Sequence, residues 1–138
     1  LGAPLFCAIA IPLEVARNGF QAPLWALAVL FWVITGLSIT VGYHRLFSHR
    51  TFEARGWVRA LFLFFGAGAV QNSALTWSAD HRNHHAFTDT DRDPYNILRG
   101  FFYAHMGWVM LHTAPGHEPP TPKDLAADPW VSLQHRFY

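Results

Sequence analysis

The chain has 138 residues, of which 51% are hydrophobic and only 14% charged, and its formal net charge is +1. Soluble domains carry about 25% charged residues, so this composition indicates a protein that lies partly in a membrane. The nearly neutral charge gives no reason to expect a nucleic-acid partner. The single cysteine, Cys7, excludes an intramolecular disulfide and a cysteine-based zinc or iron–sulfur site within these residues.

The first third of the chain is predicted to enter the membrane. Residues 1–13 are typical of the end of a membrane helix, and residues 14–21 of a polar connection that turns at Asn18 and Gly19. Residues 22–43 are the best spanning segment, because 22 residues at 1.5 Å each give about 33 Å against a hydrocarbon core of about 30 Å. The alternative is a buried helix of a soluble protein. Nine of the ten basic residues lie from Arg45 onward, which places this end of the helix on the cytoplasmic side.

A first pair of histidines, His44 and His49, follows the spanning segment. Residues five apart lie about 140° from each other on a regular α-helix, so the two imidazoles are not expected to bind one ion from such a helix. Either each serves a different ion of a two-metal site, or the helix ends between them.

The apolar residues 60–76 decide the topology. If they crossed the bilayer, the histidines beyond them would lie on the side opposite His44, and the two groups would not share a metal site. The glycines Gly66 and Gly68 and the polar residues 71–73 favour a segment that lies in the interface or enters and returns. We therefore predict that it does not cross.

The second histidine group is the strongest signal in the chain. Residues 80–85 read DHRNHH, so on a helix His84 lies about 60° to one side of His81 and His85 about 40° to the other. Neutral imidazole is the commonest side-chain metal ligand, so three on one face predict a metal site rather than a solvated polar turn.

The remainder of the chain is predicted to be peripheral. The acidic residues 88–96 lack the glycine and distal glutamate of a calcium loop, and they favour a solvated loop or cap. Residues 100–112 are aromatic but too short to span, which suits an interfacial helix, and residues 115–122 are a proline-rich link. Four further histidines are dispersed and are expected to be interfacial or solvent-facing: His105, His112, His117 and His135.

The chemistry expected of this pattern is oxidation of a lipid chain. Glutamate occurs only at positions 14, 53 and 118, so the carboxylate-rich di-iron sites of soluble oxygenase bundles do not fit. Breaking an unactivated C–H bond needs iron and O₂ rather than side chains alone. Hydrolysis of a lipid by zinc stays an alternative, as does a non-catalytic membrane protein that binds a metal or haem.

The two histidine stretches resemble the His boxes of the membrane fatty-acid desaturases of the Δ9 type. Residues 44–49 (HRLFSH) are similar to the first box and residues 80–85 to the second, and residues 91–96 and 99–108 are similar to the stretch that follows. The resemblance implies an all-α integral membrane fold with interfacial helices that carry the boxes. It also implies a di-iron centre, O₂ as co-substrate, an external electron-donor protein and a cis double bond as product. The implied iron ligands are His44, His49, His81, His84 and His85.

The departures from the family are also informative. No third His box is present, so residues 1–138 are expected to be the N-terminal part of a single desaturase domain, truncated at both ends and inactive alone. A lipid hydroxylase or alkane oxygenase of the same architecture is the nearest alternative. A bacterial inner membrane is favoured over the endoplasmic reticulum.

The resemblance also bears on the acyl carrier. Asn72 and Asp80 match substrate contacts of the family, but Ala79 and the pair His112-Thr113 stand where the animal acyl-CoA desaturases have cations that meet coenzyme A phosphates. Two other cations, Arg82 and Arg99, could compensate in part. We therefore expect a long-chain acyl thioester with weakened coenzyme A recognition, or an acyl lipid, as substrate.

Overall fold

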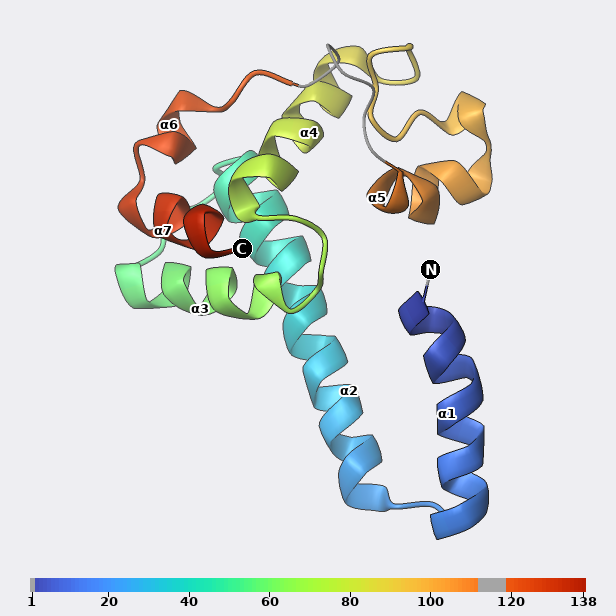
Figure 1. Cartoon of the computed structure of the whole chain (residues 1–138). Helices are drawn as coiled ribbons and strands as arrows, with labels where there is room; N and C mark the ends of the chain where they lie inside the picture. The colour runs from blue at the N-terminus through green and yellow to red at the C-terminus, as the bar shows by residue number, and fades with distance from the viewer. Residues whose placement is uncertain (1, 112–118) are drawn as a thin grey trace. The chain divides into compact units, whose positions relative to one another are not determined.

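The computed structural model describes residues 2–111 and 119–138, without the side chains of residues 2–4 and 109. All regular elements in the described residues are helices, as predicted (Figure 1). The chain divides into two compact units, Leu1–Val33 and Ile34–Tyr138. The metal-binding candidates all belong to the second unit.

The first unit consists of α1 (Gly2–Asn18) and the first turns of α2 (Ala22–Leu37). Helix α1 is longer than predicted, because residues 14–18 continue it instead of forming a polar connection. The Asn18 side-chain amide donates to the Glu14 carboxylate at 2.7 Å, one turn away, and supports the last turn. The reversal is confined to residues 19–21, where Gly19 has a φ of +72°, a conformation that glycine adopts without strain.

The candidate membrane helix continues beyond its predicted end. Helix α2 runs directly into η1 (Ser38–Ser48), and residues 22–48 form the one helix in the described ranges that is long and apolar enough to cross a membrane. The element η1 is a π-helix, in which each N–H bonds to the carbonyl five residues earlier. This wider helix carries the chain past His44 and places Ser48 at its last position.

The core of the second unit lies between η1, α3 (Gly56–Ala67), α4 (Ala74–Phe87) and α7 (Pro129–Phe137). Gln134 of α7 connects the other three: its amide donates to the Tyr43 hydroxyl and to the Leu63 carbonyl, and its oxygen accepts from the Ala74 N–H. The buried apolar side chains around this link are those of Tyr43, Leu46, Phe47, Leu63, Ala74, Leu75, Trp77, Leu125 and Val131.

The helix between the two histidine groups is too short to span a bilayer. Helix α3 has 12 residues, about 18 Å at 1.5 Å per residue, against the 30 Å or so of a hydrocarbon core. The chain then turns before α4, whose N-cap is Ser73: its hydroxyl accepts from the Thr76 N–H at 3.3 Å. The prediction that residues 60–76 lie along the membrane surface or return from it agrees with this geometry.

The residues after α4 form a loop and short helices: η2 (Ile97–Arg99), η3 (Tyr103–Gly107) and α5 (Trp108–Met110). Phe101 and Phe102 are 73% and 66% exposed, which suits the predicted interfacial helix, whereas Trp108 packs against the core. Of the predicted proline-rich link, residues 119–122 are described and are not helical. His112, Thr113 and His117 lie outside the described residues. The short helix α6 (Lys123–Ala126) leads into α7.

Candidate metal centre

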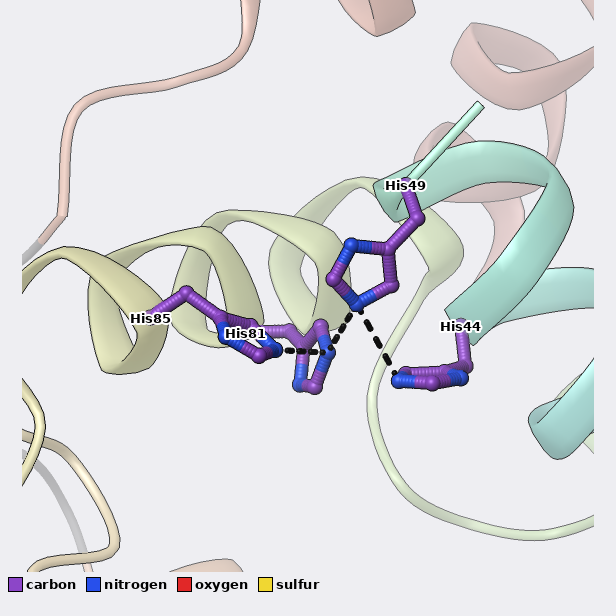
Figure 2. A group of neighbouring side chains, drawn as sticks. All are labelled: His44, His49, His81 and His85. Atoms are coloured by element: carbon purple, nitrogen blue, oxygen red, sulfur yellow. Dashed lines mark hydrogen bonds between the residues drawn. The ribbon is translucent and has the colours of Figure 1, made fainter. Parts of the chain in front are cut away.

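Two pairs of histidines from distant parts of the sequence meet at the end of η1. One ligand nitrogen from each of His44, His49, His81 and His85 lies within 4.8 Å of the others (Figure 2). The Nε2 atom of His49 is 3.1 Å from that of His44 and 3.0 Å from that of His81, and the Nε2 atom of His85 is 3.1 Å from that of His81. Four imidazoles thus point their nitrogens at one small volume.

The π-helical register explains how His44 and His49 come together. The N–H of His49 bonds to the carbonyl of His44 at 3.0 Å, so residues five apart lie one turn above each other. The angle of about 140° that separates them on a regular α-helix does not apply here. The helix also ends at Ser48, between the two histidines, as the second of the two sequence-based alternatives predicted, and both imidazoles belong to the same cluster.

On α4, His81 and His85 lie one turn apart and both join the cluster, whereas His84 stands beside it. The Nδ1 atom of His84 is 2.9 Å from both carboxylate oxygens of Asp93. Of the five predicted ligands, the structure therefore brings four together, and it holds the fifth against a carboxylate.

Asp93 is the residue of this site that the sequence analysis missed. Its side chain is fully buried and also accepts the backbone N–H groups of Asp89 and Tyr95, at 2.9 and 3.1 Å. The prediction of a solvated loop or cap for residues 88–96 is therefore wrong for the buried Asp93, whereas Asn96, also buried, is the N-cap of the helix that begins at Ile97, where its side chain accepts from the Leu98 N–H. A carboxylate that accepts from Nδ1–H of a histidine leaves Nε2 free for a metal, which is the usual second-shell arrangement.

His81 has a comparable partner. Its Nδ1 lies 2.8 Å from the Tyr95 hydroxyl, and the Trp77 indole stacks on its ring at a centroid distance of 4.8 Å. For Nε2 of His81 to bind a metal, Nδ1 must carry the proton and donate to the Tyr95 oxygen. The tyrosine and the indole together fix the plane of the imidazole.

The cluster fits a transition metal ion. Burial, reinforced by the neighbouring His44 and His85, lowers the pKa of His81 to about 3, so that this imidazole is neutral at physiological pH. Neutral imidazole is the form that binds metals, and a nitrogen-only donor set suits iron, copper or zinc. The chemistry of the donors thus agrees with a metal site, and no other such group of His, Cys, Asp and Glu occurs among the described residues.

The other predicted residues are placed as follows. Asp80 is buried directly before His81, and burial raises the pKa of its carboxyl to about 6. Asn72 is exposed in the turn before α4, with a φ of +71°, and its backbone N–H donates to the Tyr138 hydroxyl. His105 and His135 are exposed and stay outside the cluster, although His135 bonds to the Ser73 hydroxyl at 2.7 Å.

We expect Asp93→Asn to weaken metal binding about 10- to 100-fold, the usual cost of losing a second-shell carboxylate. The asparagine side chain has no charge to face His84. Its NH₂ group would also point at a backbone N–H, either that of Asp89 or that of Tyr95, which now donates to the carboxylate. The measurement is the number of metal ions retained per chain during dialysis against a graded chelator. Asp91→Asn, an exposed change in the same loop, is the control. Equal retention in the two variants would show that Asp93 does not support the site.

The chain is similar to proteins of known family. Residues 23–137 match the family model described as fatty acid desaturase. The probable acyl-CoA desaturase of Schizosaccharomyces pombe is 39% identical over 133 residues, which are 93% of this chain and 28% of that protein. Acyl-CoA desaturase 1 of Saccharomyces cerevisiae is 42% identical over 80% of this chain and 22% of its own length. An acyl-CoA desaturase of Ovis aries is 44% identical over 83% of this chain and 33% of its own. The chain therefore spans a third or less of the length of these three relatives.

Proposed function

The chain belongs to the fatty acid desaturase family, and from this premise we propose that it forms part of the metal centre of an enzyme that inserts a cis double bond into a long-chain acyl group. Residues 1–138 are then the N-terminal part of a single desaturase domain. The observation that carries the proposal is the convergence of four imidazoles at the end of an apolar helix long enough to span a membrane: His44 in η1, His49 directly after it, and His81 and His85 in α4.

The proposed ligands divide into two groups. His44, His49, His81 and His85 hold one iron, and His84, which Asp93 orients, serves a second iron together with residues beyond this chain. Iron with O₂ supplies an oxidant strong enough for an unactivated C–H bond. In the balanced reaction the acyl chain loses two hydrogens, an external donor protein supplies two electrons with two protons, and O₂ leaves as two waters.

The proposed location follows from the same helix. The His boxes face the cytoplasm, because Arg45, Arg50, Arg55 and Arg59 follow the apolar segment closely and positive charge favours that side. The three relatives described above come from fungi and a mammal, so they give no support to a bacterial inner membrane.

The proposal is tested on the protein purified with its natural flanking sequence. We expect iron bound as a pair with the Mössbauer signature of a di-iron site, and a desaturated acyl product in mass spectrometry. The 138-residue chain alone should show no turnover. A hydroxylated product would instead identify a lipid hydroxylase, and a haem spectrum, or zinc as the bound metal in elemental analysis, would contradict the proposal as a whole.

The names of the relatives favour an acyl thioester as substrate, and the structure restricts which cations can meet its carrier. Ala79 is buried and brings no charge, and the Arg82 guanidinium is already bonded to Asp124 and to two backbone carbonyls. Arg99 is exposed, and its Nη1 donates a hydrogen bond to the Tyr103 hydroxyl. Of Arg82 and Arg99, therefore, the second is the better candidate to compensate for the lost phosphate contacts.

We expect Arg99→Ala to raise the KM for acyl-CoA about two- to fivefold, the range for one exposed charge contact. Added salt should raise the KM of the parent and leave that of the variant less affected, because it screens the same contact. Arg136→Ala, which removes an exposed guanidinium from α7, is the control. A strong preference for acyl-CoA that responds neither to salt nor to Arg99→Ala would show that other residues hold the phosphates. A higher rate with an acyl lipid or an acyl-carrier-protein ester would instead identify the carrier as one without these phosphates.

A further inference from the structure

The guanidinium of Arg82 joins three elements of the second unit. Its Nε donates to the Ser48 carbonyl at 3.0 Å and its Nη2 to the Phe47 carbonyl at 2.9 Å, at the end of η1. Its Nη1 and Nη2 each donate to one carboxylate oxygen of Asp124, both at 2.8 Å. Arg82 itself lies on α4, next to His81, whereas Asp124 comes from α6.

The end of η1 needs such a donor. The last carbonyls of a helix have no partner within the helix and carry partial negative charge. Phe47 and Ser48 are buried, with 1% and 6% of each residue exposed, which leaves little access for water around these carbonyls. A guanidinium fork supplies two N–H groups in a fixed plane, so it caps both carbonyls and holds them at a set distance from α4.

These two carbonyls directly precede a predicted ligand. His49 follows Ser48 in the chain, and its Nε2 must reach that of His81 on α4, 3.0 Å away. Any movement of the end of η1 away from α4 would move His49 out of the cluster. Arg82 ties the two elements together through atoms other than the ligands themselves.

Asp124 holds the guanidinium from the opposite side. Both side chains are about one third exposed, at 32% for Arg82 and 35% for Asp124, and the bond is bidentate. The hydrogen bonds from Arg82 hold the pKa of the Asp124 carboxyl below its usual value, so that this carboxylate is charged at neutral pH. Arg50 approaches the same carboxylate at 3.8 Å but is 71% exposed, and it adds little.

We infer that Arg82 is a positioning residue of the metal centre: backed by Asp124, it fixes His49 against His81 and His85, so that the four-histidine site exists before metal arrives. The inference rests on the proposed function, since it concerns the retention of metal by that site. We call the guanidinium of Arg82, together with the Asp124 carboxylate and the two carbonyls that it binds, the clamp. The inference thus also assigns a role to residues 123–126, which supply the carboxylate of the clamp.

The test uses the protein with its natural flanking sequence, loaded with iron, and compares Arg82→Gln, Arg82→Lys and Asp124→Asn. The readout is the rate of iron loss to a chelator, with the melting temperature of the metal-free protein measured beside it. We expect both Arg82 variants to lose iron about 10- to 100-fold faster than the parent, as for other residues that orient metal ligands. Lysine fails because one ammonium cannot reproduce the fork that reaches two carbonyls and a carboxylate.

Asp124→Asn keeps the carbonyl contacts but loses the charge, so it should accelerate iron loss less than Arg82→Gln does. If the Arg82 variants do not fold, Asp124→Asn alone tests the inference. A rate of iron loss in Asp124→Asn equal to that of the parent would then overturn it. The control is Arg136→Gln, which also removes a guanidinium, but one that lies over the Phe137 ring at the end of α7 instead of at the end of η1. Parental rates in Arg82→Gln, or full rescue by Arg82→Lys, would also overturn the inference. A parent that retains no iron would instead overturn the proposed function, and the clamp with it.

Discussion

Replacing His81 by alanine is expected to empty the metal centre and to stop turnover. His81, like His49, is an inner member of the cluster, because its Nε2 lies 3.0 Å from that of His49 and 3.1 Å from that of His85. Its removal deletes one ligand, leaves the Tyr95 hydroxyl without its partner and opens the space beside Trp77. Loss of a second-shell residue typically costs 10- to 100-fold in metal affinity or activity, and loss of an inner ligand should cost more than about 100-fold.

The measurement combines iron per chain with the turnover of the protein that carries its natural flanking sequence. His105→Ala is the matched control, because His105 is exposed and its Nδ1 bonds to the Phe101 carbonyl of its own helix. His84→Ala should also abolish turnover but retain more iron than His81→Ala, since His84 stands outside the four-histidine group. A His81→Ala protein with parental iron and turnover would contradict the assignment of the centre.

The positions of the helices were largely predictable from hydropathy and chain length. The uncharged stretch between Arg17 and Arg45 predicted the long helix. The need for both histidine groups to share a side led to the prediction that residues 60–76 do not cross the membrane, and α3 is indeed too short to cross. These inferences depend on average properties over many residues, such as segment length and charge. Such averages survive local irregularities, and the helical fold class was therefore correct.

The register of η1 was not predictable in the same way. Whether a helix continues as α or π depends on how its side chains pack, and nothing in the order of residues 38–48 separates the two. In this chain Tyr43 and Phe47 are completely buried against neighbouring elements, and hydroxyls such as that of Ser48 bond back to helix carbonyls. His44 and His49 share one face only because this packing holds the helix in the π register.

The supporting residues were missed because they act through three-dimensional contacts. Asp93 lies nine residues after His84, in an acidic stretch whose composition favours a solvated loop, and only the fold shows that its side chain is buried. Arg82 was interpreted as a possible phosphate contact, yet its partners are Asp124 and the end of η1. Ligand types can be found from sequence patterns, whereas the groups that orient them depend on the folded chain.

Gly66→Ala is expected to separate α3 from η1 and thereby destabilise the second unit. A Cβ atom at Gly66 would lie 2.7 Å from Cζ and 3.0 Å from the hydroxyl oxygen of Tyr43. The tyrosine ring cannot turn aside, because it is fully buried and its hydroxyl bonds to Gln134. Overpacking of this kind costs about 1–3 kcal/mol, more than the gain of up to about 1 kcal/mol that alanine brings to a helix interior. Iron retention should fall as well, because η1 carries His44 and His49 follows directly after it.

Gly36→Ala provides the control for this prediction. Gly36 is also a helical glycine, in α2, but a Cβ atom there would have nothing within 4 Å, so alanine should be neutral or slightly stabilising. The measurement is the melting temperature of both variants in the same detergent, with iron retention recorded in parallel. A loss of 1 kcal/mol lowers the melting temperature of a small domain by about 4–8 °C, which is large enough to separate the two variants. Equal melting temperatures would mean that α3 and η1 can move apart at no cost, and that their close contact at Gly66 does not hold the histidine-bearing helix in place.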